Sequence, residues 1–480
     1  MFFNSFSFLL FFLVLFITHW FIAKKSLSLQ NLLLLVASYY FYSRWDYRFA
    51  ALLLFSTGLD FWLGHKISND PGRKKIWFWT SIISNLGILV VFKYYNFFVT
   101  SFQDALSLSG ININFTTLNI LLPIGISFYT FHGLSYIIDI YKGKIVPEKD
   151  FVKYAVFVSF FPLLVAGPIE RATHLLPQFQ QPRVFDQKKA VDGLRQILLG
   201  LFKKIVIADN CAEYVNFAFH NPSAMSASTL VLAASLFGYQ VYCDFSGYSD
   251  IAVGTAKLLG IDLIQNFNFP YFSRNCLEFW RRWHISLTSW FTDYVYKPLS
   301  RKGLSNLMNA RNVFIVFVLS ALWHGAKWTF VIWGVLNAIF IIHSTLVASK
   351  KSSIGSIAKG KNIPPIKDIL AIFVTYLKFI FAGIFFRAEN MTQAKAYVSG
   401  LFSKSIISIP DFPNLTWLTI LFIICIGFTT SEWFMRNKVF SLQIDNVKSS
   451  KVRMMIYYVM ILMIIFLKPE QTNQFIYFQF

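Results

Sequence analysis

Long apolar runs recur along the whole chain, and they limit its fold more than any other feature. A helix needs about 20 mostly apolar residues to cross a bilayer, and lipid offers no hydrogen-bonding partner to irregular backbone. Hydrophobic residues make up 56% and charged residues 14% of the chain, whereas soluble domains carry about 25% charged residues. The runs cover approximately residues 6–22, 27–42, 49–63, 76–92, 118–140, 230–242, 313–323, 328–347, 369–386, 415–428 and 454–467. We predict an all-α, polytopic integral membrane protein with about 10–12 transmembrane helices, plus re-entrant and interfacial helices.

Basic residues follow alternate apolar runs in the first third of the chain: Lys24 and Lys25 follow the first run, and Lys142 follows the fifth. Cytoplasmic loops of membrane proteins are enriched in Lys and Arg. We therefore predict an extracytoplasmic N-terminus. No basic residue precedes the first run and no small-residue cleavage site follows it, so we expect a retained helix rather than a signal peptide.

The formal net charge of +21 would indicate a nucleic-acid partner in a soluble protein. In a membrane protein the same excess is expected on cytoplasmic loops, which bind anionic lipid headgroups. We predict the lipid bilayer as a partner and no nucleic acid. The four cysteines, Cys211, Cys243, Cys276 and Cys425, lack CxxC spacing, which favours packing over metal binding or redox chemistry.

No soluble domain is evident, because no polar stretch is long enough to form one. We predict a single membrane domain over residues 1–480. Its motif-rich core covers about residues 118–346, a Ser-, Gly-, Lys- and Pro-containing cytoplasmic linker covers about 349–367, and the C-terminal helices cover about 368–480.

Two polar stretches interrupt the apolar sequence within the core. Residues 159–179 contain Pro162 and the Gly167-Pro168 pair, which prevent a straight helix and favour a re-entrant hairpin. Residues 242–280 contain Asp244 and Asp250. Because no histidine cluster accompanies these aspartates, we expect hydrogen bonds between helices and no metal site.

The segment EFWRRWHISLTSW, residues 278–290, gathers charged, aromatic and histidine side chains. At helical spacing, Trp280, His284 and Leu287 share one face, while Arg282 and Ser286 lie on another. This pattern predicts an amphipathic helix near the cytoplasmic interface with its aromatic face inward. His284 belongs to the buried face of that helix.

His324 lies between two apolar runs, residues 313–323 and 328–347, and Gly325 follows it. A histidine at membrane depth is costly and is therefore a candidate functional group. A desolvated imidazole stays neutral and is available as a general base. From the residues alone, a structural histidine beside Trp323 and Gly325 is an open alternative.

Several motifs in this order resemble the membrane-bound O-acyltransferase superfamily: LLPIGISFYTF, AGPIER, DFSGYSDIAVG, NFNFPYFSRNCLEFWRRWHISLTSWFTDYVY, ALWHGAKWTFVIWG, FFRAEN and FIYFQF. The resemblance runs from about residue 32 to residue 480 and is most specific between Asp244 and Gly334. Within the superfamily it points to the branch containing the membrane subunits of alginate O-acetyltransferases. The implied fold is a ring of membrane helices around a thin partition, with a cytoplasmic funnel and an outer cavity.

The resemblance also implies roles for individual residues. His324 matches the active-site histidine of the family and His284 its second motif histidine, so both are candidate catalytic residues. Supporting roles are expected for Asp244, Asn268 and Trp323. Arg281 and Arg282 are candidates for binding the donor's phosphates, although an ion pair with Glu278 or Asp293 is an equal alternative for these arginines.

The function implied is transfer of an acetyl group from a cytoplasmic thioester, such as acetyl-CoA, across the bacterial inner membrane to an extracytoplasmic polysaccharide. His324 would deprotonate the acceptor hydroxyl or accept the acetyl group itself. We expect no tightly bound cofactor. We expect two partners, a periplasmic acetyltransferase protein and a cell-surface polysaccharide acceptor. The segments KPLSRKGLSN and SALWHG depart from the family pattern, which leaves the acceptor and partner surfaces open. The family architecture also serves D-alanylation of teichoic acids and acetylation of peptidoglycan or other surface glycans. A transporter or flippase of glycan intermediates is the alternative function.

Overall fold

The computed structural model describes residues 1–113, 115–118, 121–165, 167–301, 303–347, 357–360, 363–470 and 474–476. The described residues form helices and loops without a strand, which confirms the all-α prediction. Much of the predicted linker, 349–356 and 361–362, lies outside the described residues, as does 477–480 of the terminal motif. Contacts divide the chain into two compact units, and the prediction of one domain over residues 1–480 stays a prediction.

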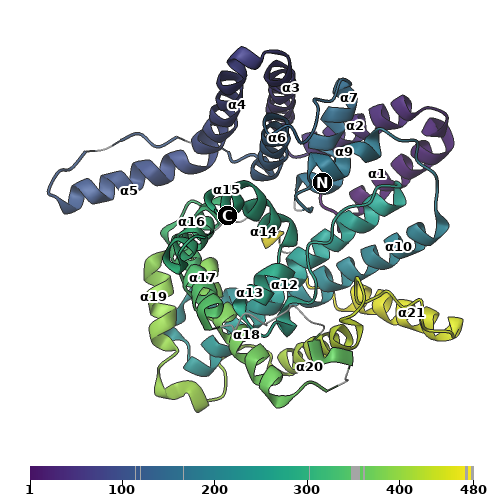
Figure 1. Ribbon diagram of the computed structural model, residues 1–480. Coiled ribbons are helices and arrows are strands. Elements are labelled where there is room, and N and C mark those ends of the chain that lie inside the picture. Colours follow the sequence, from purple (N-terminus) through teal and green to yellow (C-terminus); the bar gives the residue numbers. More distant parts are fainter. Residues whose placement is uncertain are drawn as a thin grey trace. The chain divides into compact units, whose positions relative to one another are not determined.

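The first unit comprises residues 1–193 and 252–264. Its helices are α1 (Phe6–Ile17), α2 (Leu27–Ser43), α3 (Tyr47–Asn69), α4 (Lys74–Leu89), α5 (Tyr95–Leu108), α6 (Ile126–Tyr141), α7 (Phe151–Ser159), α8 (Phe161–Leu164) and α9 (Ala172–Phe179). Helices α3, α4 and α6 pack together (Figure 1). Buried Asp60 on α3 accepts hydrogen bonds from Ser81 (2.7 Å) and Asn85 (2.9 Å) on α4.

The segment predicted to form a re-entrant hairpin does not form a straight helix. Helix α7 ends at Ser159, α8 is a single turn around Pro162, and α9 begins only at Ala172. The described residues 159–170 of this stretch are buried within the unit. Protein therefore surrounds the irregular backbone. At membrane depth, the hydrogen-bonding groups of such a backbone need protein around them because lipid offers no partners.

The second unit comprises residues 194–251 and 265–480. Two of the unit boundaries fall within α10 (Gln187–Phe202) and α12 (Ala227–Leu258), and the third lies in the loop between residues 264 and 265. The other helices are the π-helix η5 (Lys203–Ala208), α11 (Asp209–His220), α13 (Cys276–Arg282), α14 (Ile285–Phe291), the π-helix η8 (Thr292–Tyr296), α15 (Lys297–Leu299), α16 (Asn306–His324), α17 (Trp328–Val347), α18 (Ile366–Arg387), α19 (Met391–Gly400), α20 (Leu415–Met435) and α21 (Ser450–Phe466).

Five helical segments of the described chain are long and apolar enough to cross a membrane. They are Pro71–Leu108, Asn306–His324, Trp328–Leu346, Ile366–Arg387 and Leu415–Met435. Other predicted spans, such as 118–140 and 454–467, correspond to the shorter helices α6 and α21. The chain is thus a multi-pass membrane protein, and the larger number of crossings stays a prediction.

Helices α16 and α17 form a tight hairpin, and α18 lies against α17 (Figure 1). A Cβ atom at Gly334 on α17 would lie 2.6 Å from the Ala321 side chain and 2.7 Å from the Phe317 carbonyl on α16. Small residues at such positions let the backbones of membrane helices approach closely. This contact holds the C-terminal end of α16, where His324 lies.

A second close contact joins α10 to α12. A Cβ atom at Gly200 would lie 2.4 Å from the Gly247 carbonyl oxygen and 2.7 Å from the Ile251 side chain. We expect Gly200→Ala to destabilise the protein by about 1–3 kcal/mol, because overpacking forces the two helices apart. Thermal unfolding of the detergent-solubilised protein measures this loss.

Gly427→Ala is the matched control, because no heavy atom lies within 4 Å of a Cβ placed at this helical glycine on α20. There we expect no loss of stability, since alanine favours the helix over glycine by about 0.5–1 kcal/mol. Equal thermal stability of the Gly200→Ala variant and the wild type would contradict the close α10–α12 contact.

Candidate active site

His324 is the last residue of α16, and α17 begins at Trp328. The predicted break between two apolar helices at this histidine is therefore confirmed. Gly325 turns the chain in an extended conformation, and a Cβ atom there would lie 2.3 Å from the Phe330 ring. The glycine lets α17 fold back directly beneath the histidine.

Aromatic rings surround the buried His324 imidazole. Ring centroids lie 5.0 Å away for Trp323, 5.1 Å for Trp333 and 5.3 Å for Phe386, all with nearly perpendicular planes. These rings come from α16, α17 and α18. They shield the imidazole from solvent, since His324 is 5% exposed, and water exclusion is one way in which active sites protect reactive intermediates.

His284 lies where the predicted amphipathic helix is interrupted. Helix α13 ends at Arg282 and α14 begins at Ile285, and His284 between them has a left-handed backbone with φ of 43°. The prediction of one continuous helix over this segment was wrong. A non-glycine residue in this conformation costs about 1–3 kcal/mol and persists only where its surroundings hold it.

The His284 side chain is buried, as its place on the apolar face predicted. Its ring packs edge-on against Phe245, with centroids 4.6 Å apart. Burial lowers the pKa of His284 to about 3, so the imidazole is neutral at physiological pH. Its ring centroid lies 5.9 Å from that of Trp323 and 6.4 Å from that of His324. The structure thus brings both predicted histidines and Trp323 into one buried, aromatic site.

Asp244 is buried on α12 and belongs to an ion-pair cluster. Its carboxylate lies 2.7 Å from Lys204 Nζ, which also lies 2.8 Å from Asp209. The other Asp244 oxygen accepts a hydrogen bond of 2.7 Å from the Ile476 backbone amide. Asp244 therefore anchors the segment near the C-terminus, whose Phe475 ring stacks on Tyr248 at 4.6 Å.

Asn268 and Arg282 meet through backbone contacts beside the site. The Asn268 amide donates to the Arg282 carbonyl at 2.9 Å, while the Asn268 side chain is exposed. Buried Arg282 forms an ion pair of 3.0 Å with Glu278 and donates to the Asn268 carbonyl. Asp293 instead pairs with Lys297. Of the two alternatives for Arg282, its contacts match the structural ion pair with Glu278.

Arg281, in contrast, is exposed and lines a cavity of about 650 Å³. Among the described residues, no carboxylate lies within ion-pair distance of Arg281. The cavity is walled by α13, α14, α16 and α17, is mostly apolar, and reaches Ser320, one helical turn before His324. Trp280 also lines it, and the Trp280 ring contacts Trp333 at 5.7 Å between centroids.

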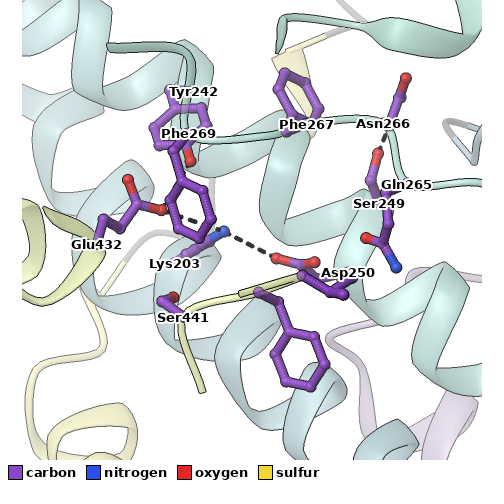
Figure 2. Close-up of a pocket in the computed structure, with 12 residues that line it drawn as sticks. Lys203, Tyr242, Ser249, Asp250, Gln265, Asn266, Phe267, Phe269, Glu432 and Ser441 are labelled. Carbon is purple, nitrogen blue, oxygen red and sulfur yellow. Dashed lines mark hydrogen bonds and ion pairs between the residues drawn. The ribbon is translucent and has the colours of Figure 1, made fainter. Parts of the chain in front are cut away.

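A second polar cluster lies in the same unit and is drawn in Figure 2. Buried Lys203 lies 2.9 Å from Asp250 and 3.9 Å from Glu432, and Tyr242 donates to Glu432 at 2.7 Å. The adjoining cavity measures about 20 Å³, which is enough for about one water molecule. Asp250 was expected to bond between helices, and it does so by linking α12 to η5.

Four residues around the histidines were not predicted from sequence: Phe245, Asn266, Trp333 and Phe386. Asn266 is the buried neighbour of His284, whereas the predicted Asn268, two positions later, is exposed. Residues two apart on a regular extended strand point to the same side, but the chain bends at Asn266 and Asn268, and NFNF contains one inward and one outward asparagine. The position of this loop against α14 decides which of the two asparagines faces His284.

Several known proteins are similar to this chain in sequence. Residues 148–384 match the model of the membrane-bound O-acyltransferase family. The probable alginate O-acetylase AlgI of Pseudomonas aeruginosa is 36% identical over 87% of this chain and 78% of its own length. The peptidoglycan O-acetyltransferase of Helicobacter pylori is 33% identical over 80% of this chain and 76% of its own length. The teichoic acid D-alanyltransferase of Bacillus subtilis is 30% identical over 46% of this chain and 59% of its own length.

Proposed function

The chain belongs to the membrane-bound O-acyltransferase family and is an O-acyltransferase, and on this premise we propose that it transfers acetyl groups to a polysaccharide. The donor is a cytoplasmic thioester, acetyl-CoA, and the acceptor is a hydroxyl group of an extracytoplasmic, alginate-like or other cell-surface glycan. The relatives named for alginate and peptidoglycan acetylation support this acceptor class. The bacterial inner membrane is the proposed location, with a periplasmic acetyltransferase as partner protein.

The observation that carries the proposal is the pairing of His324 and His284 in one buried, aromatic site, with ring centroids 6.4 Å apart. In the proposed reaction, His324 removes the proton from the acceptor hydroxyl. The hydroxyl oxygen forms an ester bond with the acyl carbon, the carbon–sulfur bond of the thioester breaks, and the thiolate leaves and takes up the proton. Neutral His284 lies beside this centre and is the second proposed catalytic residue.

The cavity beside α16 suits a donor that approaches from one side of the site. Its apolar wall fits the pantetheine part of a thioester, and exposed Arg281 offers a positive charge for a donor phosphate. The indole rings of Trp280 and Trp333 stand between the cavity and His324, with centroids 5.7 Å apart. In this proposal they separate the bulk of the donor from the reacting acyl group.

The proposal is tested with inside-out membrane vesicles that contain the full-length chain, its partner protein and the polysaccharide. Acetyl-CoA carrying ¹³C in its acetyl group is added outside, and mass spectrometry measures labelled ester on the enclosed polysaccharide. Labelled ester is the expected result. Unlabelled polysaccharide in vesicles that still esterify it from crude cytosol would contradict acetyl-CoA as donor.

Arg281→Gln is expected to raise the apparent KM for acetyl-CoA about 5- to 10-fold and to leave kcat unchanged. Loss of one solvent-exposed hydrogen bond, worth about 1–1.4 kcal/mol, produces such a change. The initial rate of ester formation at several acetyl-CoA concentrations measures it. Lys297→Gln removes one positive charge from an exposed side chain that does not line the cavity, and its KM should match the wild type. Equal KM values for all three proteins would contradict donor binding by Arg281.

A further inference from the structure

Asn266, in the loop before α13, contacts His284 and is buried, with 1% of its surface exposed. We infer that Asn266 is a positioning residue that fixes the tautomer and the backbone conformation of His284. The inference rests on the proposed function, because it concerns how the second histidine takes part in acyl transfer. The amide oxygen, the amide nitrogen and the backbone carbonyl of Asn266 all form hydrogen bonds.

The amide oxygen of Asn266 faces three possible donors. The Ser286 backbone amide lies 3.2 Å away, the Ser286 hydroxyl 2.9 Å and His284 Nδ1 3.1 Å. A backbone N–H can only donate, so the atom that it faces is the amide oxygen and not the amide nitrogen. Because that oxygen can only accept, Nδ1 of His284 must carry the proton.

The nitrogen end of the same amide confirms this orientation. Asn266 Nδ2 donates to the Ser249 hydroxyl on α12 at 3.2 Å, as the dashed line in Figure 2 marks. A flipped amide would place its N–H groups against the Ser286 N–H and would lose this bond. Ser249 and Ser286 therefore hold Asn266 from two sides, and neither serine is exposed.

Asn266 also supports the left-handed backbone of His284. The Ile285 backbone amide donates to the Asn266 carbonyl oxygen at 2.9 Å, and the next amide, Ser286, bonds to the Asn266 side chain. These two bonds satisfy amides at the start of α14, which lack partners within the helix. The same residue thus offsets the cost of the turn and sets the direction of the imidazole.

The consequence lies at the opposite nitrogen of the ring. With Nδ1–H bonded to Asn266, the neutral imidazole carries its lone pair on Nε2, which alone can accept a proton. The tautomer of an active-site histidine is commonly set by the bond that its other nitrogen makes. Without Asn266, both tautomers become available, and the fraction of molecules with a basic Nε2 falls.

The test compares Asn266→Leu, Asn266→Asp and wild type in washed membranes with undialysed cytosol as the source of acyl donor. Ester formed on polysaccharide is divided by the amount of folded protein and measured across pH. We expect Asn266→Leu to lower the rate about 10–100-fold, by analogy with loss of the hydrogen-bond partner that orients a metal-bound histidine. Asn266→Asp keeps an acceptor for Nδ1, so its rate should exceed that of Asn266→Leu.

The pH profile separates positioning from folding. A carboxylate at position 266 stabilises the imidazolium form of His284, so in Asn266→Asp the loss of activity at low pH should begin at a higher pH. The other titratable groups nearby are His324 on α16 and Asp244 on α12, and the Lys203–Asp250 ion pair adjoins Ser249. None of them changes in this comparison.

Asn85→Leu is the matched control, because Asn85 is also a buried asparagine but bonds to Asp60 in the other compact unit. It should reduce the amount of folded protein and leave the pH profile unchanged. The inference is overturned if Asn266→Leu retains the wild-type rate per folded molecule, or if Asn266→Asp retains the wild-type pH profile. Crude cytosol supplies the natural donor, so failure of acetyl-CoA alone would refute the donor proposal without affecting this result.

Discussion

Replacing His324 with alanine should lower acyl transfer by about 10²–10⁴-fold, the usual contribution of a positioned general base. The His324 imidazole is buried among Trp323, Trp333 and Phe386, so no solvent base can take its place. Mass spectrometry of the cell-surface polysaccharide, at matched amounts of membrane protein, measures the remaining ester-linked acetyl. The same measurement on His284→Ala tests the second histidine, for which we expect a smaller loss.

His343→Ala is the control for this experiment, because His343 is an exposed histidine on α17. Its polysaccharide should be acetylated as in the wild type. If acetylation persists in His324→Ala while the amount of exported polysaccharide falls, His324 is not the base. That outcome would favour transport of glycan intermediates, the alternative function.

Replacing Lys203 with methionine should have the largest effect on stability, about 3–5 kcal/mol, because it leaves buried carboxylates without a counter-charge. Asp250 lies 2.9 Å and Glu432 3.9 Å from the lysine nitrogen, and all three side chains are buried. The expected result is a lower unfolding temperature and less folded protein in membranes. Fluorescence-detected size-exclusion chromatography after heating measures both.

The triple variant Lys203→Met, Asp250→Asn, Glu432→Gln removes the charges together and should recover much of the lost stability, since neutralised partners leave no buried charge unpaired. Lys297→Met serves as the surface control, because its ion pair with Asp293 is exposed and worth about 0–1 kcal/mol. A single Lys203→Met variant as stable as the wild type would show that the cluster does not stabilise the unit.

The apolar runs were sufficient to predict helices, because helix is the one structure that satisfies its own backbone in lipid without a partner strand. They were less informative on length: the run at residues 118–140 became a helix only from Ile126 to Tyr141. Gly125 adopts φ of 75° at its start, and a Cβ atom there would lie 1.9 Å from the Leu164 carbonyl oxygen. A contact distant in sequence thus limits where this helix begins.

The two histidines were recognised from sequence for different reasons. His324 stands where an apolar pattern breaks, and that break is local information. His284 was placed on a buried face by helical periodicity, which was correct for burial but wrong for the helix itself, because the chain turns at His284. Helical periodicity indicates which side chains are buried. It does not indicate that one residue within the segment has a left-handed backbone.

Sequence alone determined the helical fold class, the membrane character and the two histidines, because these depend on apolar run length and on costly polar residues at membrane depth. Tertiary structure alone decided which side chains contact the two histidines. Arg281 and Arg282 are adjacent and chemically alike, yet one lines a cavity and the other is paired with Glu278. Asn266 and Asn268 differ in the same way. Such distinctions depend on the direction of each side chain relative to distant helices, and no local pattern in the chain carries that information.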